Sequence, residues 1–359
     1  MSYTRSFPPN QLQNLVFCRA LACVLVVLLH VAALGFHQWD KNWWASNTYD
    51  GLARISVPLF LMLSGALLLH KREPLGVFFK KRFRRILPPL IGWSLFYLIW
   101  NQVRDPTPSA LSQAFLKAIY TPSGHHLWYL YALIGIYLTI PFLRVFYQHS
   151  TGKEKQLWLL LWAGINGGLI FFPKASVIQS QYALFSFIGL IGYVFVGAWI
   201  MEWQPRRTYS IGAVLSLISG SLVTLLGTYW LSRSQAKPSV LFYDYLSLNV
   251  ILAATSAFYL IVHYAHRWPK PTGLTLWLST HSLTIYGVHV FFIQLYTPLY
   301  QKFSFIIQGW WLIPIFTFFI LIQIGIVILI RRLLVSIHPL FTGFSPRHEP
   351  TSTTSSPKQ

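Results

Sequence analysis

Acidic residues are scarce in this sequence. Its 359 residues include 8 Asp and Glu against 28 Lys and Arg, which gives a formal net charge of +20, and only 10% of the residues are charged. A soluble domain has roughly 25% charged residues, whereas 54% of this chain is hydrophobic. The composition therefore excludes a water-soluble globule and a disordered chain. It also argues against a nucleic-acid partner, because a chain this apolar could not keep such a basic surface in water.

Cysteine is equally scarce, with Cys18 and Cys23 as the two examples. They lie five residues apart in one apolar segment and would face different sides of a helix, so we predict neither a disulfide nor a metal site from them. The sequence has no HExxH motif or similar cluster, and we expect no metal. It also has no Walker A loop and no GxGxxG motif, so nothing indicates nucleotide hydrolysis or a Rossmann fold.

The sequence is instead rich in long apolar runs, which predict transmembrane helices when they reach about 18 residues. We predict about ten spans, at 13–36, 51–70, 86–102, 126–147, 157–173, 183–203, 210–231, 242–264, 275–298 and 309–330. The expected fold is all-α, a polytopic transmembrane helix bundle within residues 1–340. The segment 341–359 is polar and rich in Pro, Ser and Thr, and we predict a disordered tail there.

The cations are unevenly distributed among the predicted loops. If the N-terminus lies inside, 19 of the 28 Lys and Arg fall on the cytoplasmic side, seven of them within 71–85, and seven fall outside. The positive-inside rule therefore predicts that both termini are cytoplasmic. The remaining two, Arg19 and Arg54, lie within predicted spans.

The first span contains Arg19 and His30, although an arginine at the bilayer centre costs at least ~2.5–3.5 kcal/mol. Eleven residues are close to three helical turns, so the two side chains share one helix face about 16 Å apart along the axis. Such a pair suits a site that reaches across the bilayer. Alternatively, Arg19 extends to the interface and His30 bonds a neighbouring helix. The positions alone leave both interpretations open.

The second span begins with Asp50 and Arg54, which are four residues apart and can pair on one helix face. The pair would place a carboxylate at the depth of His30. Lower in this span, Ser64 precedes Gly65, which allows close helix packing or the approach of a ligand. A serine that contacts another helix is the simpler interpretation of Ser64, because no GxSxG motif surrounds it.

The segment 71–85 is the densest charge in the chain, and we predict a cytoplasmic loop there. It is either a topology anchor bound to anionic lipid or a docking site for a polyanionic ligand. Arg82 and Arg85 have RxxR spacing with Arg84 between them, and the planar guanidinium group binds two phosphate oxygens at once.

Two later spans carry further candidates. Trp128 lies at the outer end of the fourth span in an aromatic cluster, where an interfacial belt is usual and stacking on a sugar is the alternative. His289 in the ninth span lies about as deep as His30. It could relay protons or simply bond a neighbour.

Together these motifs resemble the membrane acyltransferase-3 family. Arg19 and His30 match its R-x10-H signature, and further similar stretches follow in order along nearly the whole chain. These stretches are SVPLFLMLSGALLL, KKRFRRILPPL, HLWYLYALIGIYL and LTIYGVHVFF. The chain is most similar to the stand-alone O-acetyltransferases of enterobacterial surface glycans, of the enterobacterial common antigen type.

The resemblance implies a bacterial inner-membrane enzyme that takes an acetyl group from cytosolic acetyl-CoA and delivers it to a hydroxyl of a surface polysaccharide or a lipid-linked glycan. The chain ends soon after the tenth span, so either the membrane domain transfers directly or a separate partner protein completes the transfer. Neither the acceptor nor the oligomeric state follows from these motifs, and a homo-oligomer is one option.

From this resemblance and the chemistry of acetyl transfer we expect a division of roles. Arg82 and Arg85, assisted by Arg84, would hold the CoA phosphates. His30 would be the general base or a transient acyl carrier. We place Asp50 beside His30 to orient its ring, and Arg19 at the entry of the CoA arm.

The same resemblance gives the remaining candidates a place in substrate binding. Arg54 would offset charge on the reacting oxygen or on a lipid-linked diphosphate. Ser64, Trp128 and His289 complete the expected substrate-binding set. The competing classes are a proton-coupled transporter or flippase, which also uses buried charges, and a membrane scaffold without catalysis.

Overall fold

The computed structural model describes residues 9–106, 118, 121–169, 187–267 and 272–342, and every regular element in these ranges is a helix. The α-helices are α1 (Pro9–Phe36), α2 (Trp43–Ala53), α3 (Ser56–Leu68), α4 (Leu75–Arg104), α6 (Trp128–His149), α7 (Gly152–Leu169), α9 (Phe187–Ile200), α10 (Arg207–Ser234), α11 (Leu248–Tyr264), α12 (Gly273–Ser304) and α13 (Gly309–Thr342). Three short 3₁₀ helices are η1 (His125–Leu127), η4 (Leu241–Tyr243) and η5 (Ala265–Arg267).

Seven helical segments among the described residues are long and apolar enough to cross a membrane, which confirms a polytopic helical membrane protein. They are Gln11–Phe36, Trp43–Leu68, His125–His149, Arg207–Ser234, Leu241–Tyr264, Gly273–Ser304 and Gly309–Leu333. Each coincides with one of the ten predicted spans.

Three predicted spans are not among these seven. Residues 86–102 form the second part of α4, whose first part is basic, while α7 covers only part of 157–173. For 183–203 the described helix α9 is apolar but only 14 residues long. Parts of the last two predictions, and most of the predicted tail, lie outside the described residues.

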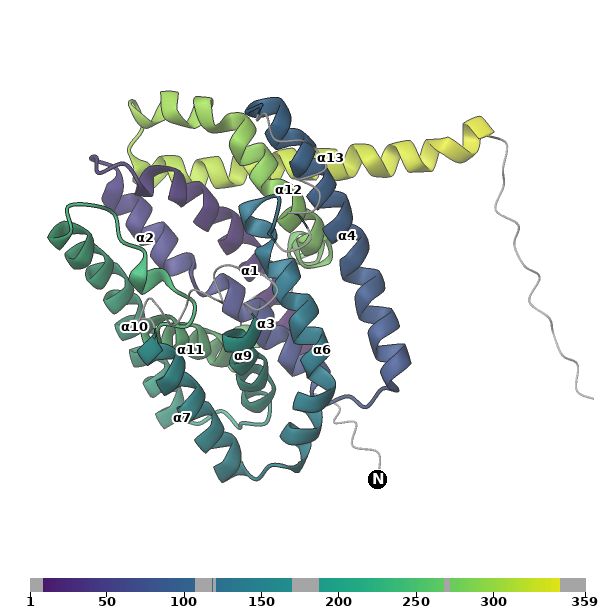
Figure 1. Cartoon of the computed structure of the whole chain (residues 1–359), viewed down its shortest axis with the longest axis vertical. Coiled ribbons are helices and arrows are strands. Elements are labelled where there is room, and N and C mark those ends of the chain that lie inside the picture. Colours follow the sequence, from purple (N-terminus) through teal and green to yellow (C-terminus); the bar gives the residue numbers. More distant parts are fainter. Residues whose placement is uncertain (1–8, 107–117, 119–120, 170–186, 268–271, 343–359) are drawn as a thin grey trace, which may run out of the picture.

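Helix α1 is the centre of the bundle. It contacts α2, α3, α11, α12 and α13, and Figure 1 shows it in the middle of the helices, with α10 at the left edge, α4 at the right and α13 across the top. Its side chains are shared between two buried hydrophobic clusters, one with α3, α6, α9 and α11 and the other with α12 and α13. A helix buried on several sides can present polar groups to more than one internal space.

Two sequence predictions need correction. The predicted loop 71–85 is helical from Leu75, so the basic segment is the first part of α4; Lys, Arg and Phe tolerate a helix well, and a run of charge does not by itself indicate a loop. The predicted span 51–70 is two helices, α2 and α3, that meet at Arg54 and Ile55. Pro58 explains the break, because it lacks the amide that would bond the Arg54 carbonyl and continue α2.

The packing of α3 against α9 depends on two glycines. A Cβ atom on Gly65 would lie 1.7 Å from the carbonyl oxygen of Val194, and one on Gly197 would lie 2.0 Å from that of Met62. The two contacts are three residues apart on each helix, and their order along α9 is the reverse of their order along α3, so the two helices pack antiparallel. This close approach is the role of Gly65, and it fixes the position of Ser64 beside it.

Candidate functional site

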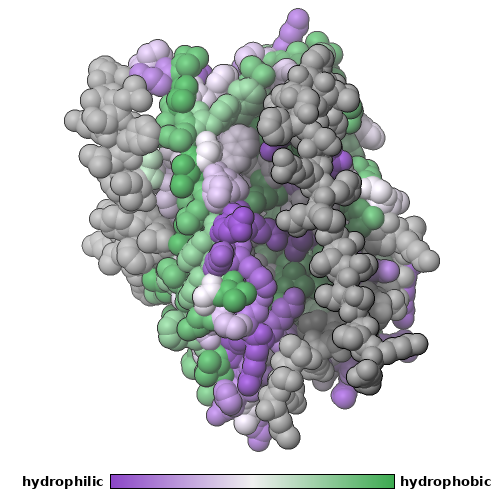
Figure 2. Space-filling view, turned by 90° about the vertical axis from the view of Figure 1, so that its right-hand side faces the viewer, coloured by the Kyte–Doolittle hydropathy of each residue, from purple (hydrophilic) through white to green (hydrophobic). Residues whose placement is uncertain are grey.

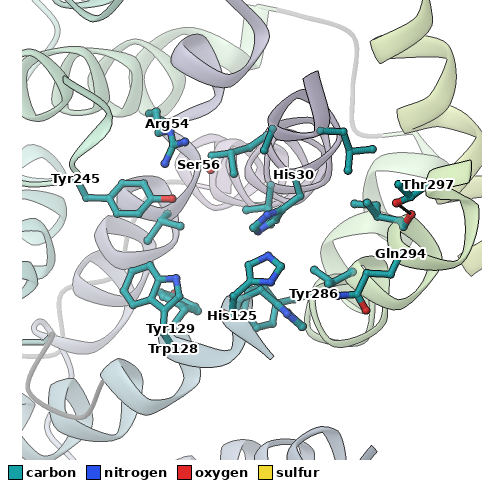
Figure 3. Close-up of a pocket in the computed structure, with 18 of the residues that line it drawn as sticks. His30, Arg54, Ser56, His125, Trp128, Tyr129, Tyr245, Tyr286, Gln294 and Thr297 are labelled. Atoms are coloured by element: carbon teal, nitrogen blue, oxygen red, sulfur yellow. Dashed lines mark hydrogen bonds between the residues drawn. The ribbon is translucent and has the colours of Figure 1, made fainter. Parts of the chain in front are cut away.

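The structure contains a cavity of about 550 Å³ around His30, which we call the histidine cavity. Its lining residues include His30, Arg54, His125, Trp128 and Tyr245. Figure 3 shows the imidazoles of His30 and His125 near the middle, with Trp128 and Tyr245 along one side and Arg54 above. The cavity therefore joins α1, the α2–α3 junction, the start of α6, the segment before α11, and α12.

Four imidazoles cluster here: His30, His125 and His126 line the cavity, and the fully buried His289 contacts them without lining it. The ring of His30 lies 5.0 Å from that of His289, 5.2 Å from that of His125 and 6.5 Å from that of His126, measured between centroids. The rings of His126 and His289 are themselves 5.2 Å apart. Among the described residues no group of His, Cys, Asp and Glu has the geometry to hold a metal ion. The cluster brings four acid–base groups within a short distance of each other.

Backbone carbonyls select the tautomers of two of these histidines. Nδ1 of His289 lies 2.7 Å from the Tyr286 oxygen and 3.1 Å from the Ile285 oxygen, and a carbonyl only accepts, so this nitrogen carries the proton. His126 Nε2 lies 3.4 Å from the Gly287 oxygen in the same manner. The other nitrogens, His289 Nε2 and His126 Nδ1, are buried without a hydrogen-bond partner in the described part of the chain. Each of these nitrogens therefore has a lone pair that can accept a hydrogen bond.

Arg54 carries the charge at the upper side of the histidine cavity. Its Nη2 lies 2.7 Å from Oδ1 of Asp50, which confirms the predicted pair, and its guanidinium stacks 4.4 Å from the Tyr243 ring centroid. Asp50 is 1% exposed. Within the described ranges, the ion pair of Asp50 is with Arg54 and none is found with His30, so Arg54 lies between the carboxylate and the cavity. Arg54 Nε is buried and has no hydrogen-bond partner there.

Two aromatic rings form a flat face in the same cavity. Trp128 and Tyr245 have centroids 5.8 Å apart and planes only 27° apart. Trp128 begins α6, directly after the 3₁₀ turn that holds His125 and His126, so the sequence HHLW delivers both imidazoles and the indole to one place.

A second cavity, of about 420 Å³, contains Arg19, and we call it the arginine cavity. The predicted residues that line it are Arg19, Ser64, Arg82 and Arg85, and Lys71 and Lys81 add two further cations. On the α4 side of the molecule, Figure 2 shows hydrophilic surface concentrated in the centre and lower half of the face, with hydrophobic surface along its left side. The Ser64 hydroxyl donates to the Phe60 carbonyl of its own helix, at 3.1 Å.

The helical form of the basic segment decides which arginines reach this cavity. Arg82 and Arg85 are three residues apart and share a helix face, whereas Arg84 is exposed and is not among the lining residues. Arg82 Nη2 lies 3.0 Å from one carboxylate oxygen of Glu73, and Lys81 Nζ lies 2.9 Å from the other. The hydrogen bond from Lys81, with the charge of Arg82, lowers the pKa of Glu73 below its ordinary value.

The two cavities share part of their lining. Tyr129 from α6 and Tyr286 from α12 line both, with Arg19 on one side of them and His30 on the other. The predicted residues thus fall into two groups, joined by two tyrosines that the sequence analysis did not select. Tyr129 directly follows Trp128 in HLWYLYALIGIYL, and Tyr286 precedes His289 by three residues in LTIYGVHVFF. Their place in these two family-like segments is the sequence feature that could have identified them.

Comparison with known proteins gives one match. Residues 13–330 match the model of the acyltransferase-3 family, described as an acyltransferase domain. No curated protein matches the chain, and no solved structure matches it. The matched range covers all the candidate residues of both cavities.

Proposed function

This chain belongs to the acyltransferase-3 family and is a membrane acyltransferase, and we propose that it transfers an acetyl group from acetyl-CoA to a hydroxyl of a glycan. The observation that carries the proposal is the arrangement along α1, where Arg19 lines a cation-rich cavity and His30 lines a cavity with imidazoles and an aromatic face. A polyanionic donor and a sugar acceptor fit these two environments.

The donor enters the arginine cavity with its phosphates against Arg82 and Arg85. Arginine forks match phosphate oxygens, and Lys71 lines the same space. The thioester then has to travel past Arg19 along α1, a distance of about 16 Å to His30.

The acceptor enters the histidine cavity. The nearly parallel rings of Trp128 and Tyr245 offer the apolar face on which a sugar ring can lie. Acceptor and donor would thus approach His30 from opposite directions, the hydroxyl from one cavity and the thioester from the other.

His30 is the general base of the proposed reaction. A ring nitrogen of His30 takes the proton from the acceptor hydroxyl as its oxygen attacks the thioester carbonyl. The tetrahedral intermediate then expels the CoA thiolate, which takes the proton back from His30. If His30 instead carries the acetyl group itself, the carbon–sulfur bond breaks first and the acetyl-imidazole passes its group to the hydroxyl.

Arg54 is suited to stabilise the tetrahedral intermediate. Its buried Nε has no partner among the described residues, and a donor that is already fixed and dehydrated stabilises a developing oxyanion strongly. The ion pair with Asp50 holds the guanidinium in place, so Asp50 acts through Arg54.

The proposal extends to location and partners. We place the enzyme in a bacterial inner membrane with Arg82 on the cytosolic side, and we take its acceptor to be a surface polysaccharide or a lipid-linked glycan of the enterobacterial type. A homo-oligomer and a separate protein that completes the transfer are both compatible with this scheme. The family match gives no support to the alternative of a transporter or flippase.

The test is incubation of purified protein in lipid nanodiscs with radiolabelled acetyl-CoA and a glycolipid extract from bacteria that lack this gene. We expect label in the glycolipid fraction, loss of that label with His30→Ala, and retention with His149→Ala, which removes an exposed histidine at the end of α6. Label transfer that survives His30→Ala would refute the assigned base. Absence of label transfer from acetyl-CoA to any bacterial glycolipid would refute the acceptor class.

A further inference from the structure

Tyr129 and Tyr286 are the residues that line both cavities while coming from different helices. Because Arg19 lies on one side of them and His30 on the other, a donor bound in the arginine cavity meets this pair before it meets the base. We propose that Tyr129 and Tyr286 form a partition between the cavities that separates the thioester from water in the histidine cavity until the donor arm displaces one ring. This inference rests on the proposed function.

The two rings contact each other directly. Their centroids are 5.7 Å apart and their planes meet at 61°, an edge-to-face arrangement. Tyr286 is 9% exposed and Tyr129 8%, so both rings are buried inside the bundle and face the two cavities. The pair therefore closes the shared wall with aromatic side chains from α6 and α12.

The two tyrosines are held in different ways. The hydroxyl of Tyr286 donates to the backbone carbonyl of His126, which ties the α12 side chain to the start of α6. The ring of Tyr129 packs against aromatic rings, including Phe60 at 6.3 Å, and lies near the charge of Arg19, but no hydrogen bond of its hydroxyl is found among the described residues. A ring held by packing turns more readily than one held by a buried hydrogen bond. We therefore assign Tyr129 as the ring that moves and Tyr286 as the fixed one.

A partition has a chemical purpose here. A base beside an open thioester would activate water as well as the acceptor hydroxyl, and the reaction acetyl-CoA + H₂O → acetate + CoA would consume the donor. Enzymes commonly exclude water from such sites with a movable element. With the partition closed, the thioester reaches His30 only when the arm itself fills the gap.

Cysteine labelling tests the partition without any enzyme activity. In a Cys18→Ser, Cys23→Ser background, which removes the two buried native thiols, Ala33→Cys places a thiol in the histidine cavity and Ser64→Cys places one in the arginine cavity. A membrane-impermeant anionic methanethiosulfonate is added to one side of oriented vesicles at a time. The side from which the thiol of Ser64→Cys reacts identifies the arginine-cavity side.

From that side, we expect the thiol of Ala33→Cys to react slowly with Tyr129 present or with Tyr129→Phe. With Tyr129→Ala it should react at least about tenfold faster, which corresponds to ~1.4 kcal/mol in the open fraction. From the opposite side its rate should be the same in all three backgrounds. An equal rate from the arginine-cavity side in all three would refute the partition.

Hydrolysis provides the functional counterpart. We expect Tyr129→Ala to release CoA thiol and acetate from acetyl-CoA without acceptor several-fold faster than the wild type, and Tyr129→Phe to match the wild type. Tyr131→Ala is the matched control, because Tyr131 is a buried tyrosine of the same helix that lines neither cavity. If the wild type hydrolyses acetyl-CoA, an equal rate in Tyr129→Ala protein that melts at the wild-type temperature would also refute the partition.

The two experiments separate the partition from the proposed function. If no variant hydrolyses acetyl-CoA and the wild type acetylates no glycolipid, the proposed function fails. The labelling rates still decide in that case whether Tyr129 closes the wall between the cavities.

Discussion

Gly65→Ala should separate α3 from α9 and damage both stability and activity. The added methyl carbon would lie 1.7 Å from the Val194 carbonyl oxygen, whereas ordinary contact begins at 3.4 Å. Because this obstacle is backbone, no side chain can turn aside, and the helices must move apart by about 1.5 Å. The reciprocal contact of Gly197 with Met62 lies one turn away, so the displacement opens the interface at both points.

The size of the effect follows from that displacement. Overpacking costs about 1–3 kcal/mol or more, and a gap of this size also removes a good part of the dispersion energy along the interface. The entropy of unfolding is about 2.1 cal/mol/K per residue, so a chain of 359 residues shifts by roughly 1–2 °C per kcal/mol, and we expect the melting temperature to fall by roughly 2–5 °C. Phe60, Leu63 and Ser64 line the arginine cavity from α3, so donor binding should weaken as well.

Thermal unfolding followed by size-exclusion chromatography in detergent measures the change. Gly92→Ala is the matched control, because a Cβ on this α4 glycine meets nothing within 4 Å. Alanine is the better helix former by about 1 kcal/mol, so this variant should melt at or above the wild-type temperature. A Gly65→Ala protein that melts within about 1 °C of the wild type would refute the packing argument.

Three further predictions concern the two cavities. Arg82→Ala should raise the KM for acetyl-CoA about tenfold, the equivalent of one lost charge-assisted contact. Arg84→Ala should leave this KM nearly unchanged, because the Arg84 side chain lies outside the arginine cavity. Equal KM values in the two variants would contradict the conclusion that α4 places Arg82, and not Arg84, in this cavity. Glu73→Gln should lower the same KM a few-fold by releasing Arg82 and Lys81 from a competing carboxylate. The pKa of Glu73 lies below its ordinary 4.5, so its ion pairs with Arg82 and Lys81 persist above that pH and are lost only as the pH falls through the lowered pKa. The ratio of the wild-type KM to the Glu73→Gln KM should therefore stay constant from about pH 8 to 5. Trp128→Ala should raise the KM for the glycolipid acceptor by about tenfold without changing that for acetyl-CoA, as initial rates with each substrate varied would reveal.

Local periodicity was enough to predict part of the site. Arg19 and His30 each line a cavity, because one helix face continues for three turns whatever surrounds it. Asp50 and Arg54 pair as their four-residue spacing predicts, although the helix ends at Arg54. Both features follow from the geometry of a single helical segment and do not depend on the neighbouring helices.

The remainder depends on tertiary structure. Nothing in the sequence places His126 beside His289, because these residues lie 163 positions apart and meet only when η1 lies against α12. Whether Pro58 ends a span or kinks it also depends on packing, as does the choice of Arg82 over Arg84. The charge density of the basic segment favours a loop, but its Lys, Arg and Phe residues are compatible with a helix, and the packing of α4 decides for the helix.

The division of the site into two cavities bears on the role of His30. A donor bound by Arg82 and a sugar stacked on Trp128 occupy different spaces, so both can be present at once. Simultaneous occupancy favours direct attack of the hydroxyl, because a transient acetyl-imidazole is useful mainly where donor and acceptor must take turns in one pocket. The partition formed by Tyr129 and Tyr286 would then be what keeps direct attack by water from competing.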